Sequence, residues 1–347
     1  MSETAESGGR ATGPRTRPEG AARPLSEAYD TALLDLDGVV YAGGEAVAHA
    51  VPSLAAARAG GMRLAYVTNN AARTPEAVAA HLTRLGVPAE AAEVVTSAQA
   101  VARLIAEGVP AGARVLCAGG EGLRVALRER GLVPVDSADE EPAAVVQGYG
   151  GPELRWGVLM EAALAVNRGV PWYASNLDAT IPGARGVLPG NGAAVEVVRM
   201  AARYRVSPRV AGKPRPPMHR ESILRTGARR PLVVGDRLDT DIEGAHVGGV
   251  DSLLVLTGVT DPAGLLAAPP EHRPTYVAAD LRGLLSPQPA VERDAQGGFR
   301  CGGWRVTGAS IEGRGEPVDA LRALCALAWS GPEGVAAATG LLGRAGW

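Results

Sequence analysis

The chain has 347 residues, of which 35 are lysine or arginine and 37 are aspartate or glutamate, so that its formal net charge is −2. This balance excludes a protein that binds nucleic acid mainly through bulk positive charge, and we expect no nucleic-acid partner. No apolar run approaches the roughly 18 residues of a membrane-spanning helix, so we expect no membrane partner either. Hydrophobic residues make up 46% of the chain, and the length predicts two folded units with room for a small third.

The first residues and the cysteines bear on order and location. Residues 1–28 contain Gly, Pro, Ser, Arg and Glu with almost no large apolar side chain, so we expect this segment to be disordered. It also lacks the apolar stretch of a secretory signal. The three cysteines are odd in number and too far apart for a zinc site: Cys117, Cys301 and Cys325. We therefore expect a reduced, cytoplasmic protein without a disulfide framework.

From Thr31 onward, short apolar runs alternate with stretches of helical periodicity. The runs are Ala32–Leu34, Leu64–Val67, Val115–Cys117, Ala143–Gln147, Trp172–Ala174, Leu232–Val234 and Leu253–Leu256. The helical candidates include Pro75–Leu85, Ala98–Glu107, Gly122–Arg130, Leu154–Asn167 and Ala193–Tyr204. Short aliphatic runs are typical of strands covered on both faces. Their alternation with helices predicts an α/β protein with a mostly parallel sheet.

The alternation stops after about residue 287. A polar, proline-containing stretch follows, and then Phe299–Thr307 predicts one or two strands. Asp319–Trp329 and Gly334–Gly343 look helical. Because a tail of this size is small for an independent fold, we expect it to dock on the main body.

Two carboxylates follow the first predicted strand. Asp35 and Asp37 stand at i and i+2, which places them on the same side of an extended segment. Close carboxylates repel each other unless a cation holds them, and Mg²⁺ is the natural cation for such a pair. One carboxylate can then act as a nucleophile and the other as a general acid–base. The alternative is a plain Asp-Gly turn, and the pair alone does not decide.

Thr68, Asn69 and Asn70 follow the second predicted strand and offer hydrogen-bond donors to a phosphate, helped by the N-terminus of the next helix. The alternative is helix capping. Thr74, with Pro75 after it, already serves as the N-cap of that helix, which leaves the three residues unexplained. The phosphate-binding interpretation is therefore favoured.

Lys213 and an aspartate cluster complete the set of polar residues near strand ends. Lys213 is flanked by glycine and proline in a chain where nearly all basic residues are arginine. Asp236, Asp239 and Asp241 follow the strand Leu232–Val234. The alternatives are a solvated lysine and acids that complement a helix dipole.

The order of these motifs resembles the haloacid dehalogenase superfamily of phosphohydrolases, in its NagD-like class IIA branch. The matching segments are DLDGVVY (35–41), TNN (68–70), GKP (212–214) and GDRLDTDI (235–242). The resemblance implies a doubly wound, parallel-sheet core over residues 29–95 and 190–287. It also implies an inserted α/β cap over 96–189 and a small C-terminal α+β appendage over 288–347.

The resemblance further implies the roles of individual residues. Asp35 is then the nucleophile and Asp37 the general acid–base, while Thr68, Asn69, Asn70 and Lys213 hold the phosphoryl group. Mg²⁺ is expected on the Asp35 carboxylate, the Asp37 backbone carbonyl and Asp236, with Asp241 orienting a metal-bound water. Asn176 is the expected substrate contact from the cap, with a turn residue as the alternative. Arg237 and Asp239 are expected to be structural.

A small phosphomonoester is the implied substrate. The layout resembles actinobacterial members, some of which are glycerol 3-phosphate phosphatases, and glycerol 3-phosphate is therefore expected. The alternatives are 2-phosphoglycolate and 4-nitrophenyl phosphate, whereas Ile181 replaces a histidine of pyridoxal-phosphate phosphatases. The resemblance also allows a homodimer formed through the cap.

Two other classes of function remain open. One is a phosphotransferase or phosphomutase that uses the same aspartyl-phosphate. The other is a non-catalytic binding protein that uses the appendage to engage a partner. The appendage itself resembles a fragment of an acetyltransferase-like fold, but it lacks a Gly/Arg-rich loop before a helix, so we expect no acyl transfer.

Overall fold

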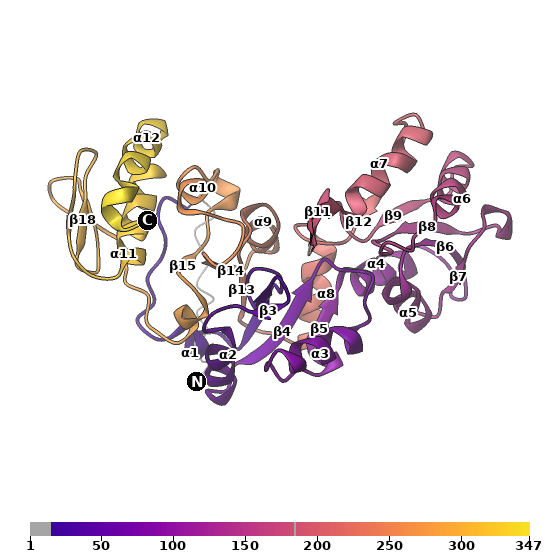
Figure 1. The fold of residues 1–347 in the computed structure, drawn as a ribbon, viewed down its shortest axis with the longest axis horizontal. Coiled ribbons are helices and arrows are strands. Elements are labelled where there is room, and N and C mark those ends of the chain that lie inside the picture. The colour runs from indigo at the N-terminus through magenta and orange to yellow at the C-terminus, as the bar shows by residue number, and fades with distance from the viewer. Residues whose placement is uncertain (1–14, 184) are drawn as a thin grey trace, which may run out of the picture.

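A computed structural model describes residues 15–183 and 185–347 (Figure 1). Its central sheet has six parallel strands in the order β15-β14-β13-β1-β4-β5. The strands are β1 (Thr31–Leu34), β4 (Arg63–Thr68), β5 (Val94–Thr96), β13 (Pro231–Gly235), β14 (Asp251–Val255) and β15 (Tyr276–Ala278). The chain starts in the middle at β1, moves to one side, and later returns to the other side. This reversal at β1 is the point at which open α/β sheets bind ligands.

Alternate residues of β1 face two different helix layers. Ala32 and Leu34 pack in a cluster with α2 (Ala50–Ala59) and α3 (Pro75–Arg84). Leu33 faces the opposite side, where α4 (Ser97–Ala106) and α8 (Pro216–Thr226) supply the apolar partners. The sheet is thus covered on both faces, as its continuous apolar runs predict. The expected doubly wound α/β core is confirmed.

A second parallel sheet forms the cap, in the order β12-β9-β8-β6-β7. Its strands are β6 (Arg114–Ala118), β7 (Val133–Val135), β8 (Ala144–Gln147), β9 (Trp172–Ala174) and β12 (Arg209–Val210), and its helices include α5 (Glu121–Glu129), α6 (Trp156–Asn167) and α7 (Asn191–Ala201). An antiparallel hairpin of β10 (Thr180–Gly183) and β11 (Gly186–Pro189) precedes α7.

The cap sheet extends beyond the boundary expected at residue 189. β12 pairs with β9, and Val195 and Val198 of α7 are buried in the same cluster as the cap residues Leu159 and Trp172. The glycine-rich segment 189–192 therefore starts a cap helix rather than returning the chain to the core. We propose a return near residue 211.

Residues 15–28 are packed on the core, so the expected disorder is wrong for this part of the segment, while residues 1–14 lie outside the described residues. The Leu25 side chain in α1 (Leu25–Ala28) is fully buried. The amides of Glu19 and Ala21 donate to the carbonyls of Thr275 and Gln288, both at 2.8 Å. One buried leucine and backbone pairing are enough to order a segment whose composition is polar.

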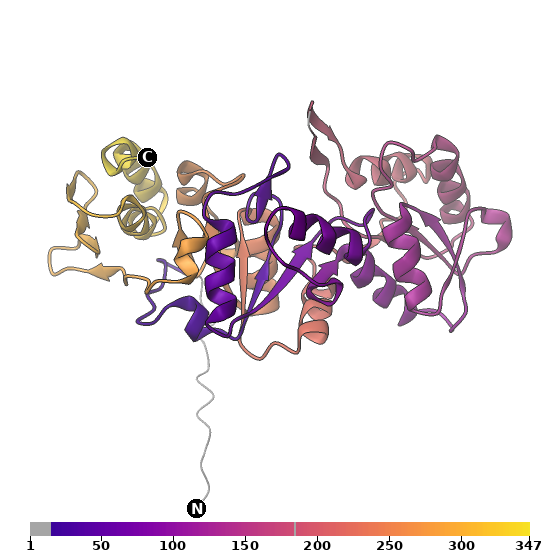
Figure 2. The ribbon, with the colours of Figure 1, turned by 60° about the horizontal axis from the view of Figure 1, so that its bottom comes forward.

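The C-terminal appendage docks on the core opposite the cap, as Figure 2 shows. It has an antiparallel sheet, β16-β17-β18-β19, and two helices. The bounds are β16 (Glu292–Arg293), β17 (Phe299–Cys301), β18 (Trp304–Val306), β19 (Ile311–Gly313), α11 (Pro317–Ala328) and α12 (Pro332–Leu341). Residues 319–328 of α11 are all buried, because this helix lies between the small sheet and the body. None of the helices in the described ranges is long and apolar enough to cross a membrane.

Candidate active site

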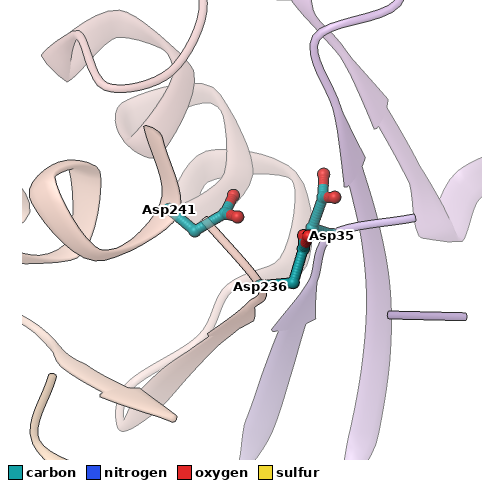
Figure 3. A group of neighbouring side chains, drawn as sticks. All are labelled: Asp35, Asp236 and Asp241. Atoms are coloured by element: carbon teal, nitrogen blue, oxygen red, sulfur yellow. The ribbon is translucent and has the colours of Figure 1, made fainter. Parts of the chain in front are cut away.

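The three central strands β13, β1 and β4 deliver their terminal residues to one edge of the core sheet. Asp35 follows β1, Asp236 follows β13, and Thr68 is the last residue of β4. Asp241 comes from the π-helical turn η3 (Leu238–Ile242) and points toward Asp35 and Asp236 (Figure 3). One carboxylate oxygen of each aspartate lies within 4.8 Å of those of the other two. The fold thus brings together three of the aspartates that the sequence singles out.

The Lys213 ammonium is held by three acceptors. Its Nζ donates to Asp35 Oδ1, to Asp241 Oδ1 at 2.8 Å, and to the Val67 carbonyl at 3.1 Å. A lysine ammonium has three protons, so each has a partner. The geometry fixes the cation directly beside Asp35.

The main chain of Lys213 is held by Asn69. The Lys213 N–H donates to Asn69 Oδ1 at 2.8 Å, and Asn69 Nδ2 donates to the Lys213 carbonyl and to Asp178 Oδ1, both at 3.2 Å. A Cβ on Gly212 would come within 2.6 Å of Asn69 Oδ1, so only glycine permits this approach. Asn69 therefore positions Lys213 rather than pointing its amide at a ligand.

Asn176 is buried and used within the protein. Its Nδ2 donates to the Asn69 carbonyl at 2.7 Å, and its Oδ1 accepts from the Asp178 N–H at 3.1 Å. These bonds tie the end of the cap strand β9 to the loop after β4. The arrangement favours the turn alternative over direct substrate contact.

Thr68 and Asn70 shape the loop before α3. Thr68 is 5% exposed, and its Oγ1 accepts from the Asn70 N–H at 3.1 Å. Asn70 Oδ1 accepts from the N–H groups of Ala72 and Arg73 at 2.9 and 3.2 Å. Thr74 caps α3 through the Ala77 N–H, as the sequence predicts. Thr68 is thus held at the end of β4, the strand that pairs with β1 beside Asp35.

Asp236 is enclosed by a loop that the sequence did not single out. Its Oδ2 accepts from the Val259 N–H at 2.7 Å, and its backbone carbonyl accepts from the Thr260 N–H at 3.1 Å. A Cβ on Gly258 would lie 2.0 Å from Asp236 Oδ2, and one on Gly38, 2.6 Å. The sequence Thr-Gly directly after the strand Leu253–Leu256 was the signal for this loop, because that strand ends at the same sheet edge.

The second carboxylate oxygen of Asp236, Oδ1, is available to bind a cation. Asp236 Oδ1 is buried and has no hydrogen-bond partner among the described residues. Such an atom is costly unless it has a ligand. When all three carboxylates are ionised, they carry two more negative charges than the single Lys213 ammonium balances. Clustered carboxylate oxygens with this charge fit a divalent, oxygen-preferring cation such as Mg²⁺.

The same crowding shifts the protonation equilibria of the cluster. Burial, together with the charges of Asp241 and Asp236, raises the pKa of Asp35 to about 8, against the opposing effect of Lys213. Burial and Asp241 raise the pKa of Asp236 to about 6. Burial lowers the pKa of Lys213, but Asp241 and Asp35 outweigh it, so that this pKa is raised. The lysine therefore stays charged beside the aspartates.

Asp37 lies at the exposed mouth of the site. The Tyr41 hydroxyl approaches Asp37 Oδ2 at 3.5 Å, and the Tyr41 ring packs edge-on against His81 with 5.1 Å between the centroids. Partial desolvation by the surrounding chain raises the pKa of Asp37, although its side chain still reaches solvent. Arg237 pairs instead with Asp239, at 2.8 and 3.1 Å, which fits the expectation that these two residues are structural.

Comparisons with known proteins agree with this geometry. A model of the haloacid dehalogenase-like hydrolases matches residues 32–133, and a HAD-hydrolase-like model matches residues 210–284. A D-glycerol 3-phosphate phosphatase from Mycobacterium tuberculosis is 45% identical over 284 residues, which make up 80% of this chain and 79% of that protein. The chain belongs to the haloacid dehalogenase-like hydrolases. The family recognised from the four motifs is confirmed.

Other phosphatases align over most of this chain. An acid sugar phosphatase from Staphylococcus saprophyticus is 38% identical over 259 residues, covering 74% of this chain and 97% of that protein. The crystal structure of a glycerol phosphate phosphatase from Mycobacterium tuberculosis in complex with magnesium has a TM-score of 0.82 at 41% identity. That likeness covers 89% of this chain and 93% of the other. The second of the two family models ends at residue 284, before the appendage.

Proposed function

We propose that this phosphatase hydrolyses glycerol 3-phosphate with Mg²⁺ as its cofactor. The observation that carries the proposal is the cluster of Asp35, Asp236 and Lys213 at the switch point of the sheet. The substrate rests on the relative from Mycobacterium tuberculosis, which is named for D-glycerol 3-phosphate. The metal is supported by the free, buried Oδ1 of Asp236.

The chemistry assigned to the chain proceeds in two transfers. An oxygen of Asp35 attacks phosphorus, the bond to the substrate alkoxide breaks, and Asp37 gives its proton to the leaving oxygen. A water molecule then attacks the aspartyl-phosphate while Asp37 takes its proton. The bond between phosphorus and the Asp35 oxygen breaks, which releases inorganic phosphate and restores both aspartates.

The remaining residues position charge. Lys213 stays beside the Asp35 oxygen and neutralises negative charge on the phosphoryl group. The Thr68 hydroxyl and the backbone N–H of Asn69 bind phosphoryl oxygens, and so does the Asn70 N–H once it turns from Thr68 Oγ1. Asp35, the Asp37 carbonyl and Asp236 would hold Mg²⁺, and Asp241 would orient a water on it. When bound, Mg²⁺ supplies positive charge that stabilises the charge developing in the transfer.

Asn69 and Asn176 take a revised role in this proposal. The Asn69 amide bonds to Lys213 and Asp178, and the Asn176 amide bonds to the Asn69 carbonyl and the Asp178 N–H. We assign both as positioning residues, which hold the phosphate loop and the cap strand end together. The leaving group is then selected by the exposed part of the cap rather than by Asn176.

Phosphate release from a panel of esters tests the proposal. The panel contains both enantiomers of glycerol 3-phosphate, 2-phosphoglycolate and 4-nitrophenyl phosphate, with Mg²⁺ or with EDTA, and Asp35→Asn is the inactive control. We expect Mg²⁺-dependent release that is fastest with glycerol 3-phosphate. Faster release from another ester would keep the mechanism and overturn the substrate.

Two further outcomes separate the other classes. Transfer of phosphate to an added alcohol in place of water would identify a phosphotransferase. The absence of release from every ester by folded protein would favour the binding protein, although the charged cluster of Asp35, Lys213 and Asp241 counts against it.

The homodimer and the cytoplasmic location also remain part of the proposal. The outer face of α6 exposes Trp156 (65%), Met160 (57%) and Leu164 (48%) at one-turn spacing, which supports pairing with a second copy through the cap. Light scattering should find a dimer that Met160→Glu dissociates.

Three free, buried cysteines support a reducing compartment, which cell fractionation checks.

A further inference from the structure

The loop that encloses Asp236 is continuous with a short helix. Val259 and Thr260 donate to Asp236, and Thr257 Oγ1 donates to the Gly38 carbonyl at 2.6 Å, which links the loop to the segment after Asp35. The chain then enters α10 (Pro262–Leu266) at once. The position of α10 therefore determines where the Val259 and Thr260 N–H groups, which donate to Asp236, are placed.

Five residues are too few for a helix to be stable on its own, so α10 needs external support. Leu265 and Leu266 are fully buried in a cluster whose other members are mainly residues of the C-terminal appendage. Trp329, at the end of α11, donates its indole N–H to the Leu265 carbonyl at 3.2 Å. That carbonyl lies in the last turn of α10 and also accepts the Ala268 N–H at 3.2 Å, so the indole gives it a second donor.

The second acidic loop rests on the same cluster. Ile242 ends the turn η3 that carries Asp241, and it is 1% exposed among the appendage residues. Leu238, at the start of the turn, packs against this cluster as well. Figure 1 shows α10 beside α11 and α12, on the side of the core away from the cap. The appendage thus packs against the loops that carry Asp236 and Asp241.

We propose that the C-terminal appendage is a positioning element for the metal site, and that Trp329 is its principal contact. It fixes α10, which fixes the loop 257–260, which in turn orients the Asp236 carboxylate. Arg322 has a different task, because its guanidinium donates to the Val277 carbonyl on the edge strand β15 at 2.6 and 3.0 Å. The inference rests on the proposed magnesium site.

Calorimetric titration of Mg²⁺ into the full chain without substrate tests this inference. Trp329→Phe keeps one aromatic ring but removes the N–H together with the five-membered ring of the indole. We expect the Mg²⁺ dissociation constant to rise by at least about five-fold, the effect of losing one ordinary hydrogen bond. At saturating Mg²⁺ its kcat should return to within about two-fold of wild type. A positioning role predicts this recovery, whereas general loss of structure does not.

Two matched variants isolate the effect. Trp347→Phe removes the same kind of bond, from the indole to the Pro317 carbonyl at 3.0 Å, but away from α10. Arg322→Gln weakens the docking at β15. Trp347→Phe should bind Mg²⁺ as wild type does, and Arg322→Gln should melt earlier with the same Mg²⁺ affinity.

The outcomes are distinct from those of the proposed function. Wild-type protein that binds no Mg²⁺ would overturn the magnesium site itself. Folded Trp329→Phe with wild-type Mg²⁺ affinity, or equal weakening in Trp347→Phe, would overturn the positioning role alone. If Trp329→Phe does not fold, Leu266→Val decides, because it trims the apolar packing of α10 in the cluster that it shares with the appendage and should also weaken Mg²⁺ binding.

Discussion

Asn69 and Lys213 are 144 residues apart in the sequence, and the Asn69 side chain forms two hydrogen bonds with the main chain of Lys213. Asn69 Oδ1 accepts the Lys213 N–H at 2.8 Å, and Asn69 Nδ2 donates to the Lys213 carbonyl at 3.2 Å. The main chain of a lysine decides where its ammonium can reach. The contact between Lys213 and Asp35 is therefore set by a residue that touches neither charged group.

Asn69→Ala should lower kcat by about 10- to 100-fold, because a small displacement of a charged group is costly in a preorganised site. Steady-state kinetics at saturating Mg²⁺ measure this effect. Asn167→Ala is a suitable control, since Asn167 Nδ2 also donates to a carbonyl, that of Ala201 at 3.3 Å, but on the surface of the cap. Unchanged kcat in Asn69→Ala would show that Lys213 keeps its position without the two hydrogen bonds from the Asn69 side chain.

Asp236→Asn should stabilise the metal-free protein. Burial and Asp241 raise the pKa of Asp236 to about 6, so the folded state binds a proton more readily than the unfolded state. The stability linked to that proton is present at low pH and is lost as pH rises through about 6. At pH 8 the carboxylate opposes folding, and its removal should add about 1–3 kcal/mol to the free energy of unfolding.

Urea unfolding in EDTA and in Mg²⁺ checks this prediction. Mg²⁺ should stabilise wild type and leave Asp236→Asn unchanged, since a bound cation stabilises only a folded state that holds it. Asp239→Asn is the matched control, because Asp239 pairs with Arg237 outside the cluster. A metal-free Asp236→Asn that is less stable than wild type would contradict the idea of an unbalanced buried charge.

Glu221 of α8 joins the core to the cap through arginines. Its side chain is fully buried and accepts bonds from Arg103 on α4, from Arg130 after α5 at 2.9 Å, and from Arg225 at 2.5 Å. Burial acts to raise the pKa of Glu221, but the arginines outweigh it, so the pKa is lowered from 4.5. The stability from a lowered carboxylate pKa is present above the unfolded value and is lost as pH falls.

Glu221→Gln should therefore destabilise the protein by about 1–3 kcal/mol at pH 7, because three partly buried arginines lose their shared counter-charge and its hydrogen bonds. The difference from wild type should narrow as pH falls below about 4.5. Chemical unfolding across this pH range measures it. Glu107→Gln breaks an exposed pair with Arg220 and should change stability by less than about 1 kcal/mol. A pH-independent difference would show that charge is not the cause.

The strands and the aspartates of the site are predictable from sequence for a common reason. Buried parallel strands need continuous apolar residues, and Asp35 and Asp236 stand where such runs end. Parallel strands end at the same edge, so residues far apart in sequence can be expected to meet there. Each of the seven apolar runs corresponds to a strand of one of the two sheets, with bounds that differ by at most two residues.

Other features carry no local signal. β12 is only two residues long, and it belongs to the cap because of its pairing with β9. Leu25 is a single apolar side chain in a polar segment, and its burial depends on distant residues. The hydrogen bonds between Asn69 and Lys213 and between Trp329 and Leu265 likewise join segments that are far apart in the sequence. The periodicity of apolar residues indicates which face of a helix or strand is buried, but it does not indicate which distant segment packs against that face.

Gly258 has almost no space beside the metal site. A Cβ there would lie 2.0 Å from Asp236 Oδ2 and 2.5 Å from its Cγ. Gly258→Ala must move either the loop or the carboxylate, and both carry the hydrogen bond from Val259. We expect a loss of about 1–3 kcal/mol in stability, together with at least about 10-fold weaker Mg²⁺ binding, because the ligand loses its position.

Gly340 supplies the control for this substitution. It lies within α12, and nothing is within 4 Å of where its Cβ would be. Gly340→Ala should therefore stabilise the chain by about 0.5–1 kcal/mol through helix propensity, without affecting Mg²⁺. Thermal unfolding and Mg²⁺ titration of the two variants separate the effects. If Gly258→Ala keeps wild-type Mg²⁺ affinity, the loop 257–260 can shift without moving Asp236, and its contact with that carboxylate does not determine the metal site.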